Sequence, residues 1–327
     1  MTPDVRLIIG RTGGPEVIET EVLDARSLGP KAGEVRLRHS AIGLNFIDTY
    51  HRSGLYPVEL PSGLGAEAAG IVEAIGAGVA DFAPGDRVAY GTGPLGAYAT
   101  VRLLPAEHLV RLPDDIADET AAAIMLKGMT TCYLIEQCTK VRSGQTVLVH
   151  AAAGGMGSIL VPWLTRIGAT VIAHAGTAEK ASSAKAAGAH HNLSCPMSEL
   201  APQVREITGG RGVNVVLDGV GQASWTASLA SVARLGMIVT YGNTSGPVPP
   251  FTALDLMQAG SVFVTRPTLA HYGATAEQRR QLAARMFAMI ADGLDVTIGQ
   301  RFRLTDAAAA HRALEQRATR GASVMIV

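Results

Sequence analysis

The chain has 327 residues, 47% of them hydrophobic and 17% charged, and this composition indicates a globular protein long enough for two domains. Its 28 basic and 28 acidic residues cancel, so the positive net charge typical of nucleic-acid-binding proteins is lacking and we expect no nucleic-acid partner. Three irregularly spaced cysteines, Cys132, Cys138 and Cys195, argue against a disulfide framework or a Cys-x-x-Cys metal site.

The N-terminal segment predicts a cytoplasmic protein. It carries Asp4 and Arg6 and lacks the apolar centre of a signal peptide. An uncharged run from Thr146 to Thr165 has the length of a membrane-spanning helix, but it contains a glycine-rich turn, His150 and Pro162. A buried strand followed by a buried helix explains this run better, so we expect no membrane association.

Residues 1–125 contain closely spaced Gly and Pro between short β-rich runs, which predicts a small, mostly antiparallel β domain. The runs are Val35–His39, Ala69–Ile75, Arg87–Tyr90 and Tyr98–Arg102.

From Asp118 the pattern becomes helical, and we expect two helices, over 118–125 and 129–139. Strands and helices then alternate, which predicts right-handed crossovers and a parallel sheet. The expected strands are 146–149, 171–175, 213–218, 237–241 and 260–265, and the expected helices are 158–167, 178–187 and 225–231. The remaining chain is expected to form helices over 276–292 and 307–317 and a last strand, 323–327, that returns to the sheet of the first domain.

The stretch His150–Gly157, of sequence His-Ala-Ala-Ala-Gly-Gly-Met-Gly, joins the expected strand 146–149 to the helix that follows. Glycine at such a turn lets the backbone approach a pyrophosphate, and the helix N-terminus offers free N–H groups to the anion. The spacing Ala152-x-Gly154-x-x-Gly157 departs from the dinucleotide fingerprint only at its first position. These features predict dinucleotide binding, the alternative being a glycine-rich junction without a ligand.

Further motifs carry a resemblance that spans nearly the whole chain. They are Asn45-Phe-Ile-Asp-Thr-Tyr50, Arg52-Ser-Gly-Leu-Tyr-Pro57, the segment Leu60–Val72, Gly85-Asp-Arg-Val88, Leu95-Gly-Ala-Tyr98, Gly242-Asn-Thr-Ser-Gly246 and Val264-Thr-Arg-Pro267. Together with the glycine turn they resemble the zinc-independent quinone oxidoreductases, the zeta-crystallin-like branch of the medium-chain dehydrogenases/reductases.

The resemblance implies an α/β protein with a GroES-like, β-rich catalytic domain and a central Rossmann domain with a doubly wound parallel sheet. It implies NADPH as reductant and a cleft between the domains. The catalytic domain would begin with residues 1–125, the Rossmann domain would span 126–265, and residues 266–327 would return to the catalytic domain.

The resemblance also implies which residues bind the cofactor. Around the nicotinamide it places Asn45, Asp48, Thr49, Tyr50, Thr130 and Tyr133; around the pyrophosphate Gly154, Gly155, Met156 and Gly157; around the adenosine ribose Gly176, Thr177 and Lys180. It adds Gly242, Asn243, Thr244, Ser245, Gly246, Arg266 and Arg317. In related enoyl reductases a tyrosine at the place that Tyr56 resembles donates a proton, so Tyr56 is the candidate catalytic residue, with an ordinary packed tyrosine as the alternative.

Residue types predict that no catalytic metal is bound, because zinc needs thiolate, imidazole or carboxylate ligands. Where zinc-dependent relatives place a cysteine and a histidine, this chain has residues near Asn45 and Ala66, and alanine cannot ligate. Glu67 is then expected to be a buried, hydrogen-bonded carboxylate.

Two polar pairs predict no chemistry. We expect His190 and His191 to be solvent-exposed, because adjacent residues of an extended segment point in different directions and no further ligands are apparent. We expect His51 and Arg52 to form a solvated pair.

The sequence therefore predicts metal-free, NADPH-dependent reduction of a small-molecule quinone. The alternatives are an enoyl or alkenal double-bond reductase and a non-catalytic nucleotide-binding protein. NADPH is favoured over NADH because no acid ends the second expected strand and Lys180 follows it, although Cys195 replaces a tyrosine of the relatives. A homodimer is expected through the β-branched run Ser261–Thr265, which resembles an edge strand.

Overall fold

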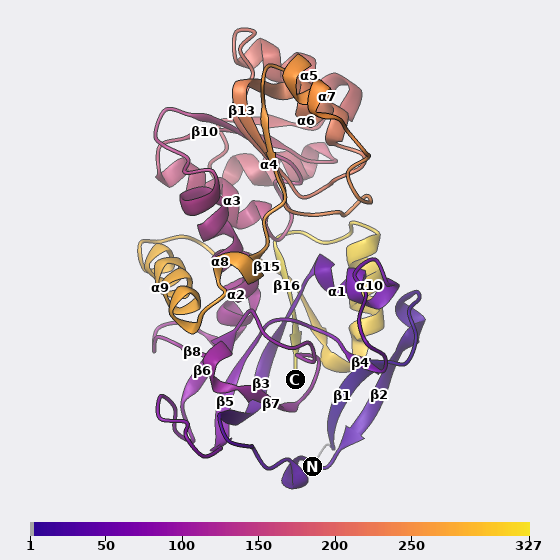
Figure 1. The fold of residues 1–327 in the computed structure, drawn as a ribbon, viewed down its shortest axis with the longest axis vertical. Coiled ribbons are helices and arrows are strands. Elements are labelled where there is room, and N and C mark those ends of the chain that lie inside the picture. The colour runs from indigo at the N-terminus through magenta and orange to yellow at the C-terminus, as the bar shows by residue number, and fades with distance from the viewer. Residues whose placement is uncertain (1–2) are drawn as a thin grey trace. The chain divides into compact units, whose positions relative to one another are not determined.

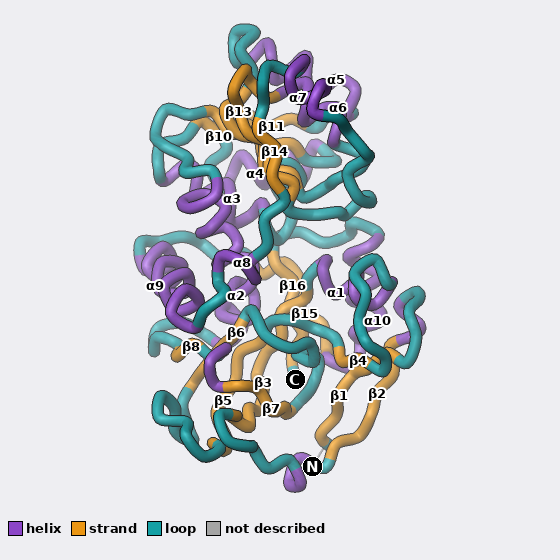
Figure 2. The backbone as a smooth tube through the Cα atoms, viewed as in Figure 1, coloured by secondary structure: helices purple, strands orange, loops and turns teal. Residues whose placement is uncertain are grey.

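The computed structural model describes residues 3–327, and the chain divides into two compact units. The outer unit comprises the chain up to Met129 together with Gly273–Ala288 and Val296–Val327. The central unit comprises Thr130–Tyr272 and Met289–Asp295. Figure 1 follows the chain through both units, and Figure 2 separates their helices from their strands.

A seven-stranded, mostly antiparallel sheet forms the framework of the outer unit. Its strands lie in the order β15-β16-β3-β5-β6-β8, and β7 also pairs with β3. They are β3 (Glu34–Leu44), β5 (Ala68–Ile75), β6 (Arg87–Tyr90), β7 (Val101–Pro105), β8 (Val110–Arg111), β15 (Ile298–Arg303) and β16 (Ala322–Ile326). Ser323 of β16 lies opposite Leu44 of β3, so the last strand joins the first domain's sheet, as predicted.

A smaller sheet and several helices complete the outer unit. The sheet contains β2 (Ile18–Leu23), β1 (Asp4–Ile9) and β4 (Ser62–Gly63). The helices are α1 (Phe46–Ser53), most of α2 (Asp118–Cys132), most of α9 (Ala276–Ala291) and α10 (Ala307–Glu315), with short 3₁₀ turns η1 (Pro15–Val17), η2 (Ala25–Ser27), η3 (Ala106–His108) and η5 (Leu304–Asp306). Buried side chains of β1, β3, β7 and β16, among them Leu7, Leu37, Leu104 and Met325, share one hydrophobic core.

The central unit contains a six-stranded parallel sheet in the order β11-β10-β9-β12-β13-β14. Its strands are β9 (Thr146–Val149), β10 (Thr170–His174), β11 (His191–Leu193), β12 (Val213–Asp218), β13 (Val232–Thr240) and β14 (Phe263–Thr265). The chain builds the sheet outward from β9 in one direction and then from β12 in the other. The point between β9 and β12 is therefore the topological switch at which doubly wound folds bind ligands.

Helices cover the parallel sheet. They are α3 (Gly157–Arg166), α4 (Ala178–Ala186), α5 (Met197–Ile207), α6 (Trp225–Ser231), α7 (Ala253–Gln258) and α8 (Leu269–Tyr272). Leu148 lies opposite Ile172 and Val216 on neighbouring strands, and this row packs in one core with side chains of α5 and α6. Figure 1 shows α5, α6 and α7 gathered beside β13. Such a row of apolar residues is what a strand buried by helices requires.

The prediction of two helices over 118–125 and 129–139 was wrong. Helix α2 runs without interruption to Cys132 and continues as a π-helix over Tyr133–Cys138. Gly128 lies within α2, and a Cβ there would overlap the side chain of Met286 on α9. The glycine is therefore required for close packing of two helices and not for a turn.

Other boundaries also differ from the prediction. The strand expected at Tyr98–Arg102 begins only at Val101, because Tyr98 is held by separate backbone bonds, receiving one from Leu7 N at 2.8 Å and donating one to Leu64 O at 2.9 Å. Helices α1, α5 and α7 and strands β11 and β15 were not predicted. No helix among residues 3–327 is long and apolar enough to cross a membrane.

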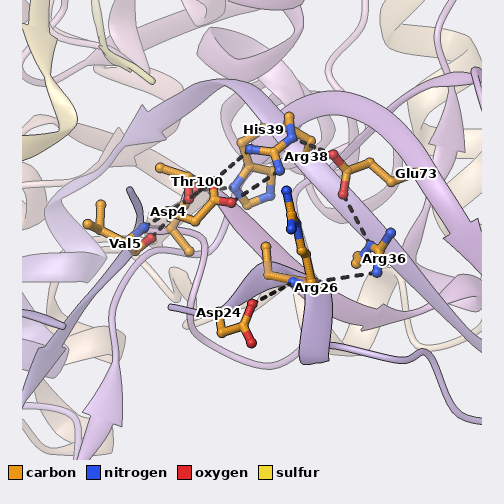
Figure 3. A network of polar contacts seen from close by, with 11 residues as sticks. Asp4, Val5, Asp24, Arg26, Arg36, Arg38, His39, Glu73 and Thr100 are labelled. Atoms are coloured by element: carbon orange, nitrogen blue, oxygen red, sulfur yellow. Dashed lines mark hydrogen bonds and ion pairs between the residues drawn. The ribbon is translucent and has the colours of Figure 1, made fainter. Parts of the chain in front are cut away.

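A polar network on the outer unit, drawn in Figure 3, links strands that are distant in sequence. Arg38 binds Asp4 at 2.7 and 3.2 Å and also pairs with Glu73, which accepts a second bond from Arg36 at 3.1 Å. The hydrogen bonds from Arg38 hold the pKa of Asp4 below its usual value. Thr100 donates to the same carboxylate at 2.9 Å, so the network ties β1, β3 and β5 together.

Candidate cofactor site and buried polar clusters

The glycine turn lies at the carboxyl edge of the parallel sheet. His150 N donates to Leu217 O of β12 at 3.1 Å, and Ala152 N donates to His174 O of β10 at 3.0 Å, so both neighbouring strands anchor the turn. A Cβ on Gly157 would lie 2.5 Å from Ala152 Cα and closer still to its carbonyl. Glycine is therefore needed at 157 for α3 to begin this close to the turn.

The turn offers hydrogen-bond donors and space of the kind that a pyrophosphate requires. The N–H groups of Gly155, Met156 and Gly157 have no acceptor within residues 3–327. At Gly154 a Cβ would meet only Ala151 O, at 3.2 Å, so the space beside this residue is open. Free donors at a helix N-terminus beside an open glycine form an anion site, and the turn therefore fits a dinucleotide.

The loop after β10, the second strand of the parallel sheet in chain order, also has open space beside a glycine. A Cβ on Gly176 would have nothing within 4 Å, and Thr177 caps α4 by accepting a bond from Lys180 N at 3.2 Å. Lys180 lies in the first turn of α4, and no Asp or Glu stands between His174 and Thr177. The backbone carbonyl of Cys195 bonds to His174 Nε2 at 2.9 Å, which places Cys195 beside the end of β10.

Backbone hydrogen bonds join the loop after β12 to the loop after β13. Thr244 N donates to Gly219 O at 3.3 Å, and Ser245 N donates to Val220 O at 2.9 Å. Gly242 packs against Gly219 so closely that a Cβ would overlap its carbonyl. The segment 242–246 is thereby fixed at the carboxyl edge of the sheet, where the sequence placed it.

Asp218, at the end of β12, is a buried acceptor at this edge. It is fully buried and accepts bonds from Val220 N, Ser224 and Ser228 at 2.6–2.8 Å. Ser228 also contacts His150 Nε2 at 2.9 Å, and burial lowers the pKa of His150 to about 4. Asp218 thus fixes the loop after β12 beside the glycine turn.

The remaining predicted cofactor residues fall in three places. Thr130 and Tyr133 lie on the last turn of α2 and the π-helix of the central unit, where Tyr133 stacks on Tyr272 at 4.4 Å. Arg266 follows β14 and donates to Thr240 O. Arg317 follows α10 in the outer unit and has a positive φ of 57°.

The segment from Asn45 to Tyr50 forms the start of α1, directly after β3. Asn45 N donates to Asp48 Oδ2 at 2.8 Å, and Thr49 donates to Phe46 O at 2.7 Å. Tyr56, the candidate catalytic residue, packs edge-on against Tyr50 with ring centroids 5.2 Å apart. The structure therefore brings Tyr56 to the segment expected to face the nicotinamide.

A buried chain of hydrogen bonds begins at Asp48. Tyr98 Oη donates to Asp48 Oδ2 at 3.0 Å and contacts His311 Nε2 at 2.9 Å, and His311 Nδ1 contacts Arg52 at 3.2 Å. Arginine can only donate, so Nδ1 of His311 accepts and Nε2 carries the proton. Burial lowers the pKa of His311 to about 3 and raises that of Asp48 to about 7. Asp48 Oδ1 has no partner among residues 3–327.

The prediction of a solvated His51–Arg52 pair was wrong. His51 is half-buried with its Nδ1 atom buried, and Arg52 is fully buried. Its side chain is 2% exposed, forms an ion pair with Glu315 and donates to Gly13 O at 3.1 Å. Arg52 lies four residues after Asp48, so both side chains point inward from the same face of α1. That spacing is the signal in the sequence that could have revealed the buried arginine.

Glu67 is buried and hydrogen-bonded, as predicted. It accepts from Asn45 Nδ2 at 2.8 Å and from Leu126 N at 2.6 Å. The sequence did not reveal its third partner, Lys127, whose Nζ donates at 2.6 Å. His190 and His191 are exposed, also as predicted. Within residues 3–327, no three His, Cys, Asp or Glu side chains gather as metal ligands would.

Comparison with known proteins identifies the family. The sequence profile of the alcohol dehydrogenase GroES-like domain matches residues 31–114, and that of the zinc-binding dehydrogenases matches residues 155–296. The chain is 47% identical to a quinone oxidoreductase of Pseudomonas aeruginosa, over 98% of this chain and 99% of that protein. It is 44% identical to a 2-haloacrylate reductase of a Burkholderia species, over 98% of each.

Solved structures agree with this match. The crystal structure of Escherichia coli quinone oxidoreductase complexed with NADPH superposes with a TM-score of 0.96 at 42% identity, over 99% of this chain and all of that one. That protein shares the predicted fold class, a GroES-like domain with a parallel-sheet Rossmann domain. The chain therefore belongs to the quinone oxidoreductases of the medium-chain dehydrogenase/reductase superfamily.

Proposed function

We propose that this protein reduces quinones by hydride transfer from NADPH, without a metal. The observation that carries the proposal is the glycine turn, where three N–H groups without acceptors lie beside open space at the switch point of the sheet. The names of the relatives support the same chemistry, since the similar E. coli quinone oxidoreductase was solved with NADPH.

We assign the central unit to the cofactor and the outer unit to catalysis. We propose a Rossmann domain over 126–265 and a catalytic domain over 1–125 and 266–327, bounds that differ from those of the central unit, Thr130–Tyr272 with Met289–Asp295. Bound NADPH would supply the hydride from C4 of its nicotinamide. The proposed pyrophosphate ligands are Gly154, Gly155, Met156 and Gly157. Around the adenosine and along the sheet edge we propose Gly176, Thr177, Lys180, Gly242, Asn243, Thr244, Ser245, Gly246, Arg266 and Arg317.

We propose that the start of α1 and the end of α2 contribute to the nicotinamide end. The residues are Asn45, Asp48, Thr49, Tyr50, Thr130 and Tyr133. Their task is to hold the nicotinamide against an electrophilic carbon or oxygen, because orientation supplies much of the catalysis in such a transfer. Tyr56, packed against Tyr50, is the proposed contact or proton donor to the acceptor.

The test is NADPH oxidation followed at 340 nm with a panel of small quinones. We expect turnover that depends on the quinone and saturates with NADPH. NADPH binding without turnover on any acceptor would instead favour the non-catalytic nucleotide-binding protein. Absence of binding would refute the proposal as a whole.

A second candidate, reduction of an activated carbon–carbon double bond, is favoured by the likeness to a 2-haloacrylate reductase. Hydride addition to the β-carbon of a conjugated carbonyl uses the same cofactor geometry. Running 2-alkenals, enoyl thioesters and 2-haloacrylate beside the quinones separates the two functions. A kcat/KM for one of these alkenes above that for every quinone would reverse our order of preference.

Activity is expected to be independent of metal. Where zinc-dependent relatives have a zinc ligand, this chain has Ala66, which cannot bind a metal. The neighbouring carboxylate, Glu67, already accepts hydrogen bonds from three donors. Prolonged dialysis against a strong chelator should leave kcat within experimental error. Stoichiometric zinc in the purified protein, together with loss of activity on its removal, would contradict this expectation.

Lys180→Ala is expected to lower kcat/KM for NADPH at least tenfold and to change that for NADH by less than about threefold. A lysine bond to the 2′-phosphate is worth about 1.5–3 kcal/mol, or roughly one to two decades in affinity. Lys185→Ala is the matched control, since Lys185 is exposed at the other end of α4. Equal losses with both cofactors would show that Lys180 does not select the phosphate.

We also propose a cytoplasmic homodimer paired through β14. This strand forms an edge of the parallel sheet, and Phe263 on it is 59% exposed. An uncovered edge of this kind tends to pair with another chain. Phe263→Asp should shift the mass measured by light scattering toward the monomer, whereas Val22→Asp, at a 68% exposed residue of β2, should leave it unchanged. A monomeric wild type would refute the dimer.

A further inference from the structure

Lys127 is a buried cation with no role in the reaction proposed above. Its side chain is 6% exposed, and its Nζ donates to Glu67 Oε1 at 2.6 Å. Glu67 is itself fully buried, and its other oxygen is held by Leu126 N at 2.6 Å. Burying two charges is costly unless they are paired and well oriented, and this pair meets both conditions.

The pair is held rigidly. A Cβ on Gly43 of β3 would overlap both Ala122 O of α2 and the Glu67 side chain, so the backbone of β3 lies directly against them. Gly43 N also donates to Glu67 O at 3.1 Å. Side chains fixed in this way can stabilise developing charge without first reorganising.

The pair lies beside the start of α1. Asn45 Nδ2 donates to the same oxygen, Glu67 Oε1, that accepts from Lys127, so the amide and the ammonium are neighbours. The charges of Glu67 and Lys127 also act on Asp48, three residues further along. Lys127, on α2, therefore lies beside the start of α1, the segment that we assign to the nicotinamide end.

The Lys127 ammonium has more N–H groups than hydrogen-bond acceptors. It carries three N–H bonds, and Glu67 Oε1 is its one hydrogen-bond acceptor within the described chain, residues 3–327. A buried cation with unused donors is stabilised by an oxygen that arrives with a ligand. The carbonyl oxygen of a quinone or of a conjugated carbonyl compound is such an acceptor.

We propose that Lys127 is a catalytic residue that donates a hydrogen bond, and then a proton, to the oxygen on which negative charge develops in the acceptor. The inference rests on the proposed function. It gives the protein an electrophile at the place where related enzymes use a metal.

The step balances as follows for a conjugated carbonyl compound. The acceptor gains a hydride, with two electrons from NADPH, at its β-carbon, where a C–H bond forms. The C=C pair shifts to the bond between the α-carbon and the carbonyl carbon, and the C=O π pair moves to the oxygen, which gives an enolate. The oxyanion takes a proton from Lys127 Nζ, and the neutral amine recovers one from water. The enol formed then tautomerises in water to the saturated carbonyl compound. With a quinone, hydride transfer to one carbonyl oxygen leaves the negative charge on the other oxygen, and the same proton transfer to that oxygen gives the hydroquinone.

The test compares Lys127→Met with the double variant Glu67→Gln/Lys127→Met. The single variant removes the ammonium but leaves a buried carboxylate without its counter-charge, so it can fail through folding alone. The double variant removes both charges and keeps side chains of similar size. It therefore removes the ammonium without leaving a buried carboxylate unpaired. NADPH affinity by fluorescence and Tm are measured beside kcat.

We expect the double variant to fold and to bind NADPH within about threefold of the wild type. Its kcat should fall at least thirtyfold with a quinone, and more with a 2-alkenal, because an enolate is more basic than a hydroquinone anion. Recovery of kcat to within threefold of wild type would show that Lys127 only neutralises Glu67 and would overturn the proposal. Loss of NADPH binding in the double variant would overturn it as well, by assigning Lys127 to the cofactor.

A measurement on the wild type does not depend on any variant. In a single turnover with a 2-alkenal, the rate should fall at least twofold in D₂O if proton donation accompanies hydride transfer. A rate unchanged in D₂O overturns the proposal even if both variants fail to fold. Failure of the wild type to turn over any acceptor refutes the proposed function itself, so the two failures are distinguishable.

Discussion

Gly157→Ala is expected to abolish tight NADPH binding and to lower Tm by several degrees. The added methyl group would lie 2.5 Å from Ala152 Cα, which is backbone and cannot move aside as a flexible side chain could. Forcing an extra carbon into a packed site costs about 1–3 kcal/mol, and here the strain falls on the turn that presents the three free N–H groups. Stability and affinity should therefore fall together.

Gly154→Ala is the matched control for this prediction. Its Cβ would meet only Ala151 O, at 3.2 Å, so the fold should tolerate it, yet the methyl group would occupy space that we assign to the pyrophosphate. We expect Tm within about two degrees of wild type and a clear loss of NADPH affinity. Thermal unfolding with and without NADPH measures both quantities. A Gly157→Ala protein with wild-type Tm, or a Gly154→Ala protein with wild-type affinity, would contradict our account of the turn.

Arg52→Met is expected to cost about 1–3 kcal/mol of unfolding free energy, because it leaves buried acceptors without their donor. The substitution takes the counter-charge from Glu315, the donor from His311 Nδ1 and the donor from Gly13 O. Water can solvate Glu315, which is 37% exposed, but His311 is buried, so water cannot replace the bond to its Nδ1 without opening α1. The loss is measured from the midpoint and slope of urea unfolding.

The same substitution at an exposed pair provides the control. Arg6 binds Glu21 at 2.5 Å, but the two side chains are 51% and 44% exposed, and exposed pairs of this kind contribute little to stability. Arg6→Met should therefore unfold at nearly the wild-type urea concentration. If the two variants were equally stable, the buried chain that leads to Asp48 would have no energetic role.

Features that depend on neighbouring residues could be predicted from the sequence. The glycine turn, the strand before it and the helix after it are coded within about 20 residues, and the alternation that follows determines the parallel sheet. Glu67 could be predicted as buried because its surroundings are small and apolar. The motifs that resemble known reductases gave the family directly.

Features that depend on distant residues could not be predicted. The contact between Arg52 and His311 spans 259 positions, and that between Glu67 and Lys127 spans 60, so no local pattern indicates either. The unbroken course of α2 through Gly128 also depends on a distant residue, since Met286, against which Gly128 packs, lies on another helix. The polar residues of α1 resembled a solvated surface because single-sequence patterns equate charge with exposure, which fails when a charge finds a partner across the fold.

The pairing of β16 with β3 has a consequence for the order in which the protein matures during synthesis. The outer unit is assembled from segments at both ends of the chain, whereas Thr130–Tyr272, nearly all of the central unit, is one continuous segment. A ribosome releases that segment before β16 is made, so the four residues Ala41–Leu44 of β3 must wait for this partner through the translation of almost 280 residues, from Leu44 to Ser323. During this interval the nascent chain carries a nearly complete nucleotide-binding unit and an unfinished sheet, and that sheet is completed only when β16 pairs with β3.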